Sequence, residues 1–220
     1  MKKLISSLLF VVATMLINTM SASAVAVEGL SANAGVTNSY LWRGLEQTNG
    51  QPAVSGGIDF ESNSGFYLGT WVSNADWADG MTYELDLYGG YVGEINSLTY
   101  DVGFVHYAYP DSVDDLDFTE VNASISYGFF SFGYALLANA ENIDFGDDGY
   151  IFLDADFSFA SDIGLSLHVG KGTDDFYAGE SFLEYGASVS KNNFTFGVSK
   201  TDLNDDDVKF IISYVASFDF

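Results

Sequence analysis

The sequence predicts an all-β protein, a transmembrane up-and-down antiparallel β-barrel of about 12 strands. Three observations support this prediction. Apolar and polar residues alternate with a period of two, the alternating segments are about nine to twelve residues long, and short connections alternate with long ones. After the first 24 residues no stretch keeps the periodicity of a helix.

The final segment illustrates the alternation. Phe210, Ile212 and Tyr214 fall on one face of an extended chain, and Lys209 and Ser213 on the other. Asn38 interrupts the apolar row of the first segment. The predicted strands are 30–42, 53–61, 65–73, 81–92, 98–109, 118–128, 130–138, 149–159, 164–171, 181–189, 194–201 and 208–220. Apolar residues occur on both faces of 65–73 and 98–109, so their orientation stays open.

The connections indicate how the strands cross a bilayer. Five short links are expected around Asn63, 93–97, 128–129, 161–163 and 190–193. Six longer ones cover 44–51, 74–80, 110–117, 139–148, 172–180 and 202–207. Short periplasmic turns and long outer loops are typical of outer-membrane barrels, and an even strand count places both termini in the periplasm.

The first 24 residues predict a signal peptide. Lys2 and Lys3 precede the apolar run 4–17, and Ala22-Ser23-Ala24 provides small residues at a cleavage site. A retained membrane anchor is the alternative, although the run is short for a spanning helix. Cleavage leaves a single barrel domain, 25–220, of 196 residues (220 minus 24). Export through a signal peptide and the barrel pattern together predict the bacterial outer membrane.

Charge and composition exclude several classes of partner. The mature chain has 31 acidic residues and five basic ones (7 minus Lys2 and Lys3), a net charge of −26. Nucleic acid is therefore not an expected partner, because its phosphates are repelled. The chain contains no cysteine, which removes thiolate metal sites, thiol nucleophiles and disulfides.

A soluble β-sandwich or lipocalin-like barrel also alternates with a period of two. Here the polar face is rich in Ser, Asn, Gly, Asp and Glu and almost lacks Lys and Arg, which favours a lumen over a soluble surface. Aromatic residues near strand ends predict interface girdles: Tyr40, Trp42, Tyr83, Tyr91, Tyr107, Tyr109, Tyr127 and Phe220.

Ten acidic residues lie on polar strand faces, where lipid contact would be costly, so we expect them to face the lumen. Carboxylates in a watery lumen attract cations. The predicted lumen and selectivity residues are Glu84, Asp86, Asp101, Glu120, Asp154, Asp156, Glu184 and Arg43. The alternative is a lumen filled by its own hydrogen-bonded side chains.

The last strand predicts an assembly signal. Tyr214, Phe218 and Phe220 share one face, and the chain stops on Phe220. Such an ending resembles the sorting signal of outer-membrane barrels and implies the barrel-assembly machinery as a partner.

The chemistry-bearing residues indicate no enzyme, metal site or cofactor. His106 and His168 are the two histidines, and neither has a serine and carboxylate at a catalytic spacing. Two histidines without any cysteine provide too few of the usual ligands for a zinc site. The acidic segment 202–207 lacks the glycine and closing glutamate of a calcium loop, so at most a loose hard-cation site is expected.

Several ordered blocks resemble the TorF family of porin-like outer-membrane proteins. They are Ser39-Tyr40-Leu41-Trp42-Arg43-Gly44, then 65–74, 84–91, 100–103 and 107–110, followed by Thr119-Glu120. The resemblance spans most of the mature chain and is densest over 29–126. It implies an outer-membrane barrel and carries no catalytic motif. His106 stands where an aromatic residue is expected.

These observations predict passive diffusion of small hydrophilic solutes with a preference for cations. A rival function is a non-conducting barrel whose acidic loops bind a partner, or bridge to lipopolysaccharide through divalent cations. An outer-membrane hydrolase is the third candidate. The solute, the oligomeric state and whether the lumen is open or plugged are not determined by the sequence.

Overall fold

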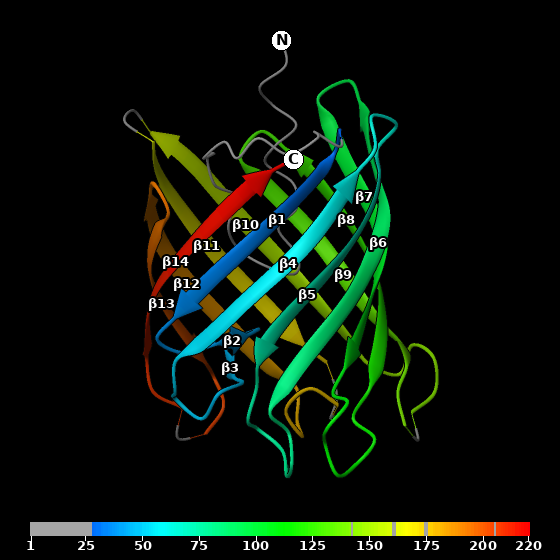
Figure 1. Cartoon of the computed structure of the whole chain (residues 1–220), viewed down its shortest axis with the longest axis vertical. Helices are drawn as coiled ribbons and strands as arrows, with labels where there is room; N and C mark the ends of the chain where they lie inside the picture. Colours follow the sequence, from blue (N-terminus) through cyan, green and yellow to red (C-terminus); the bar gives the residue numbers. More distant parts are fainter. Residues whose placement is uncertain (1–27, 142, 160–161, 174–175, 205) are drawn as a thin grey trace.

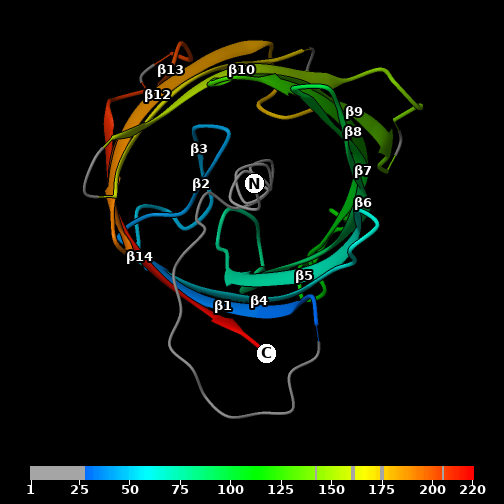
Figure 2. The same cartoon turned by 90° about the horizontal axis from the view of Figure 1, so that it is seen from above.

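The computed structural model describes residues 28–141, 143–159, 162–173, 176–204 and 206–220 and forms one closed antiparallel barrel (Figures 1 and 2). The twelve barrel strands follow the predicted order. They are β1 (Leu30–Thr37), β4 (Ala53–Glu61), β5 (Phe66–Asn74), β6 (Tyr83–Ile95), β7 (Leu98–Ala108), β8 (Phe118–Tyr127), β9 (Phe130–Asn139), β10 (Gly149–Phe159), β11 (Ile163–Gly172), β12 (Phe182–Lys191), β13 (Phe194–Thr201) and β14 (Lys209–Asp219). The predicted fold class is confirmed.

Each strand pairs with its neighbours in sequence, and β1 closes the barrel against β14. Ala34 pairs with Ala216 on one side and with Gly56 of β4 on the other. Tight turns join strands at the end that holds both β1's start and the C-terminus (Figure 1). Asn96 and Asn192 have φ values of 58° and 51° there, which a short hairpin turn requires and asparagine tolerates. The predicted alternation of short and long connections is confirmed.

The period-two pattern separates two surfaces. Large apolar side chains project outward from every wall of the barrel, including Leu68, Val102 and Phe196, which are 61%, 56% and 56% exposed. The alternate positions point inward and are mostly polar or small. This orientation resolves the two ambiguous segments, because Trp71 of β5 and Tyr107 of β7 are both buried inside. Among the described residues no helix is long and apolar enough to cross a membrane.

The first predicted strand, 30–42, is too long. β1 ends at Thr37, and the chain turns into the barrel to form a two-stranded hairpin of β2 (Leu41–Trp42) and β3 (Leu45–Glu46) (Figure 2). Asn38 explains the exit. Its side chain donates to the Phe210 carbonyl at 2.8 Å and accepts from the Ile212 amide at 2.7 Å. These side-chain bonds replace the backbone hydrogen bonds between β1 and β14 at the point where β1 leaves the barrel wall.

The predicted signal peptide, 1–24, lies outside the described residues.

Candidate functional site

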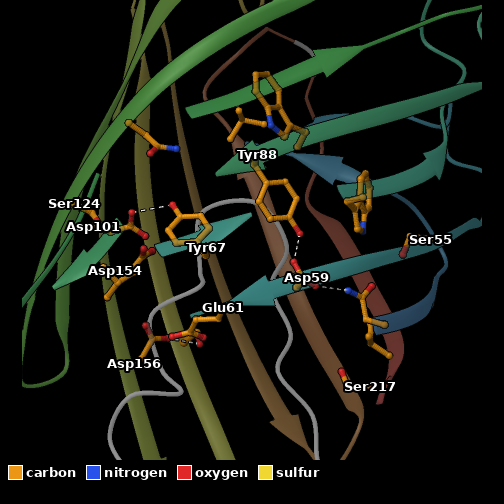
Figure 3. Close-up of a pocket in the computed structure, with 18 of the residues that line it drawn as sticks. Ser55, Asp59, Glu61, Tyr67, Tyr88, Asp101, Ser124, Asp154, Asp156 and Ser217 are labelled. Atoms are coloured by element: carbon orange, nitrogen blue, oxygen red, sulfur yellow. Dashed lines mark hydrogen bonds between the residues drawn. The ribbon is translucent and has the colours of Figure 1, made fainter. Parts of the chain in front are cut away.

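The barrel encloses a cavity of about 1150 Å³ (Figure 3). It extends from the short turns, where Ser62, Asn63 and Phe220 line it, to the β2–β3 hairpin, where Tyr40, Trp42 and Arg43 line it. None of the described residues of the connections 75–82, 109–117, 140–148, 173–181 and 202–208 lines this cavity. The cavity is therefore closed toward the long loops by the hairpin.

Carboxylates paired with phenols line one wall of the cavity. Tyr67 donates to Asp101 at 2.9 Å, and Tyr88 donates to Asp59, which also accepts from Asn33 at 3.4 Å (Figure 3). These side chains come from the five neighbouring strands β1, β4, β5, β6 and β7. The hydroxyl donors hold the carboxylates in place without neutralising their charge.

A histidine joins the carboxylates of the opposite wall. His168 of β11 contacts Asp154 of β10 through Nδ1 at 2.5 Å and Glu184 of β12 through Nε2 at 3.3 Å. The Tyr150 hydroxyl also lies 2.8 Å from Nε2 and donates to Glu184. Both imidazole nitrogens are therefore engaged, and this histidine acts as a bridge between carboxylates.

Arg43 lies at the tip of the hairpin that closes the cavity. It makes two hydrogen bonds to Glu120 of β8, at 2.8 and 2.7 Å, and the two side chains are only 8% and 1% exposed. Burial opposes its charge, but Glu120 outweighs burial and raises the pKa of Arg43 above its usual range. Tyr177 donates to the same Glu120 at 2.6 Å. The Arg43–Glu120 pair is thus a buried, bidentate ion pair.

Aromatic rings surround the Arg43 guanidinium. Its central carbon lies 4.2 Å from the Trp42 ring centroid, 4.1 Å from that of Tyr150 and 4.9 Å from that of Tyr177. Rings at this distance attract a cation through their negative faces. Arg43 has a φ of 51°, which is uncommon for a residue other than glycine. The ion pair and the rings offset that local backbone cost.

Gly44 completes the two-residue turn, with a φ of 75°. A Cβ there would lie 2.9 Å from both the Glu184 carboxylate and the Thr201 methyl group, so the hairpin tip fits closely against β12 and β13. Positive φ at both turn residues matches the type I′ turn that short hairpins favour. The Ser39–Gly44 block therefore encodes an inward hairpin rather than the end of a strand.

The predicted aromatic girdle is wrong at four positions. Tyr40 and Trp42 lie inside the barrel on the hairpin, and Tyr107 and Tyr109 are 2% and 5% exposed. Trp42 packs against Tyr107 and Phe118 with centroid distances of 5.5 and 5.9 Å. These rings pack together at the end of the barrel that carries the long connections. Tyrosine and tryptophan near strand ends are also typical of an interface girdle. Only the inward positions of these rings distinguish a cluster inside the barrel from a girdle on its outer surface.

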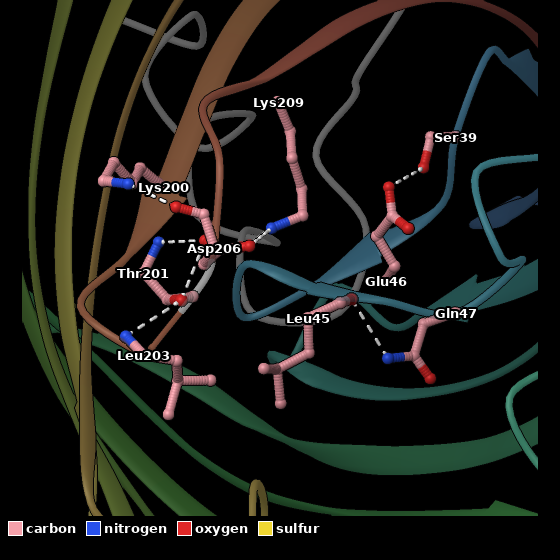
Figure 4. A network of polar contacts seen from close by, with 9 residues as sticks. All are labelled: Ser39, Leu45, Glu46, Gln47, Lys200, Thr201, Leu203, Asp206 and Lys209. Carbon is pink, nitrogen blue, oxygen red and sulfur yellow. Dashed lines mark hydrogen bonds and ion pairs between the residues drawn. The ribbon is translucent and has the colours of Figure 1, made fainter.

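A second polar network fixes the connection before β14 (Figure 4). Asp206 accepts from the Thr201 amide and hydroxyl at 2.8 Å each, and from Lys209. Lys200 donates to the Asp206 carbonyl at 2.5 Å. Burial favours the neutral acid, but the bonds from Lys209 and Thr201 outweigh it and lower the pKa of Asp206. Figure 4 also shows Ser39 and Glu46 of the hairpin side by side.

All eight predicted lumen residues point into the barrel, in two groups. Asp101, Asp154, Asp156, Glu184 and Arg43 line the cavity. Glu84, Asp86 and Glu120 are each 1% exposed and lie outside its lining, at the closed end. Their role in selectivity stays a prediction. The sequence did not single out Tyr150 or Tyr177, which are common residue types without a motif. Tyr214 and Phe218 are 37% and 40% exposed and point outward, whereas Phe220, 39% exposed, borders the cavity at the end of the short turns.

The described residues contain no group of three or more His, Asp or Glu side chains placed to hold a metal ion. His106 faces outward and contacts Thr119 Oγ1 at 3.0 Å. The two histidines therefore lie on opposite surfaces of the barrel wall.

Two solved barrels share the fold of this chain. A KdgM porin superposes with a TM-score of 0.55 at 10% identity, over 87% of this chain and 98% of that one. A structure from a study of in-meso crystallization of membrane proteins gives a TM-score of 0.56 at 9% identity, over 86% of this chain and 84% of that one. Pseudomonas aeruginosa OccK5 (OpdH) gives a TM-score of 0.43 at 16% identity, over 87% of this chain and 68% of that one.

No curated protein matches the sequence. The resemblance to the TorF family stays a prediction, because the family model that matches carries another description. That model covers residues 21–219 and describes a bacterial protein of unknown function. The chain belongs to this family, Gcw_chp.

Proposed function

We propose that this protein is an outer-membrane channel for passive diffusion of small hydrophilic solutes, with a preference for cations, and that the β2–β3 hairpin closes its outer end. The cavity of about 1150 Å³ inside a barrel with an apolar outer surface carries the proposal. A water-filled lumen inside an apolar belt is the arrangement by which β-barrels conduct. The shared fold with the KdgM porin is consistent with this function.

The preference for cations follows from the charges that face the cavity. Acidic side chains occur on most of its wall, including Asp59, Asp101 and Asp156. Among the described lining residues, the basic side chains are Arg43 and His168, and both are paired with carboxylates. The net field therefore attracts cations and repels anions.

In this proposal the protein lies in the bacterial outer membrane and contacts lipid and lipopolysaccharide. The barrel-assembly machinery recognises the end of β14 through Tyr214, Phe218 and Phe220. Among the described lining residues we identify no catalytic set, and we propose no enzymatic activity. His168 lies between Asp154 and Glu184, and the Tyr150 hydroxyl beside it is bound to His168 and Glu184.

A planar-bilayer recording of the refolded barrel tests the channel. We expect small conductance steps and a reversal potential, under a salt gradient, on the cation-selective side. The fourfold variant Glu84→Gln, Asp86→Asn, Asp154→Asn and Asp156→Asn should shift that potential toward anions, with a smaller shift at high salt.

The matched control neutralises four exposed acidic residues of the outer connections, Asp76, Asp79, Asp114 and Asp115, with the same change in net charge. It should alter selectivity less, because loop charges are screened by solvent. A conducting barrel whose selectivity is the same in both fourfold variants would contradict the role of the lumen carboxylates.

One observation favours the rival, a non-conducting barrel. The hairpin and the buried Arg43–Glu120 pair close the outer end of the cavity. In that case the acidic outer loops, not the lumen, would provide the function, by binding a partner or divalent cations. A refolded barrel without any conductance would establish this alternative.

A further inference from the structure

Aromatic rings that face the cavity lie over glycines of neighbouring strands. Tyr88 of β6 pairs with Gly69 of β5, and Gly69 pairs on its other side with Asp59 of β4. The Tyr88 hydroxyl reaches across Gly69 and donates to Asp59 (Figure 3). Tyr88 and Asp59 line the cavity, whereas Gly69 is buried beneath them. A glycine inside a strand often marks such a close approach by another group.

The space over Gly69 is filled by these two side chains. A Cβ at this position would lie 2.5 Å from Tyr88 Cζ and 2.6 Å from Asp59 Oδ1. Non-bonded carbon atoms pack at about 3.5–4.0 Å, so an added methyl group would displace the ring by about 1 Å. The atoms that it would meet belong to side chains, which can move without breaking the strand ladder. Because Gly69 faces inward, the displacement is directed toward the lumen.

Two other rings repeat the arrangement. Tyr67 of β5 lies over Gly90 of β6, where a Cβ would be 2.7 Å from its Cζ, and its hydroxyl donates to Asp101 of β7 at 2.9 Å. In another part of the wall, Phe152 of β10 pairs with Gly133 of β9 and covers it. A Cβ at Gly133 would lie 2.5 Å from Phe152 Cε1, and Phe152 also lines the cavity.

The rings therefore follow the barrel wall instead of crossing the lumen. Over a residue with a Cβ, the same ring would have to point farther toward the barrel axis, which narrows the space that a barrel of this size encloses. We propose that Gly69 and Gly133 set the width of the lumen, and thereby the largest solute that it admits. Each glycine does so by keeping its partner ring against the wall. The inference rests on the proposed channel function and adds the residues that determine its size limit.

The width is measured without any current, on the refolded barrel in detergent micelles. The chain has no cysteine, so Ser55→Cys provides a single thiol. Ser55 lines the cavity and lies on β4, farther from the short turns than Asp59 (Figure 3). Two methanethiosulfonate reagents of equal charge are compared, one with a primary ammonium group and one with the bulkier trimethylammonium group. Their reaction rates report access to the thiol from the end of the short turns.

Gly69→Ala should slow the bulkier reagent about two- to tenfold and the smaller one less, because the displaced ring must leave its rotamer to let the reagent pass. Gly133→Ala should act in the same way through Phe152. Gly197→Ala is the matched control. It adds the same methyl group at a lining position where the nearest atom is Ser188 Cβ at 3.4 Å, so no ring moves. Its rates should match those of the Ser55→Cys parent.

The double variant Gly69→Ala with Tyr88→Leu removes the ring and should restore the rates. Equal rates in Gly69→Ala and Gly197→Ala, or a double variant as slow as Gly69→Ala, would overturn the inference. If Gly69→Ala fails to fold, as judged by heat modifiability, a folded double variant supports the collision with Tyr88, and Gly133→Ala then reports the width. Failure of both to fold contradicts the inference. Slowed labelling without conductance defeats the channel alone, whereas conductance with unchanged labelling defeats this inference alone.

Discussion

Replacing Arg43 with leucine should release the hairpin that closes the barrel. The substitution places an apolar side chain of moderate size at this position and removes the guanidinium that joins the hairpin tip to β8. Glu120 would keep its hydrogen bonds from Tyr177 at 2.6 Å and Tyr107 at 3.4 Å but would lose its opposite charge. We therefore expect Arg43→Leu to lower stability and to raise conductance.

The magnitude follows from burial. Glu120 is 1% exposed, and removing one partner of a buried ion pair costs about 3–5 kcal/mol because the remaining charge is uncompensated. Each ring contact of the guanidinium adds about 0.5–2 kcal/mol. Part of this loss is recovered if the hairpin moves out and Glu120 becomes hydrated. The expected loss in the free energy of unfolding is therefore about 3 kcal/mol or more.

Urea unfolding of the refolded barrel measures the loss, in a cycle with Glu120→Gln and the double variant. The double variant should lose less than the sum of the two single variants, because no unpaired charge is left. Lys209→Gln is the control. It breaks the Lys209–Asp206 pair and should cost less than Arg43→Leu, because Asp206 keeps its two hydrogen bonds from Thr201.

The same variants are then recorded in planar bilayers. Arg43→Leu should show larger steps or more frequent openings than the parent, and Lys209→Gln should not. If Arg43→Leu unfolds like the parent and conducts like it, the Arg43–Glu120 pair does not hold the hairpin. If stability falls but conductance is unchanged, the hairpin is fixed by its aromatic contacts instead.

Three further outcomes are expected. An epitope tag beside Asp147 should be reached by antibody on intact cells, and one beside Asn192 should stay hidden; labelling at Asn192 alone would reverse the orientation of the barrel. Phe220→Asp should leave export intact but reduce the amount of heat-modifiable barrel in the outer membrane, and an undiminished amount would exclude the sorting role. Because the pKa of Asp206 is lowered, its bonds to Thr201 should persist as pH falls to the ordinary aspartate value of about 4 and be lost below it, as measured by hydrogen exchange at the Thr201 amide. Loss of protection well above that pH would contradict the anchoring role of Asp206.

The sequence alone determines the barrel. Strand positions follow from a period of two, because successive side chains of a strand face opposite surfaces whatever the rest of the chain does. The carboxylates of the inward face were identified for the same reason: lipid excludes charge, so Asp101, Asp154 and Asp156 had to point inward. Alternating connection lengths settled the topology.

Only the tertiary structure decided what happens inside the barrel. The segment Tyr40–Gly44 has the composition of a strand end, and its inward turn depends on Glu120, which is 77 residues away from Arg43 in the chain. Asn38 interrupts the apolar row for a reason visible only against β14, where it replaces ladder bonds. Local periodicity cannot encode such contacts, since they arise when strands distant in sequence meet across the lumen. The closed hairpin end of the cavity and, among the described residues, the unpartnered Asp86 are consequences of that packing.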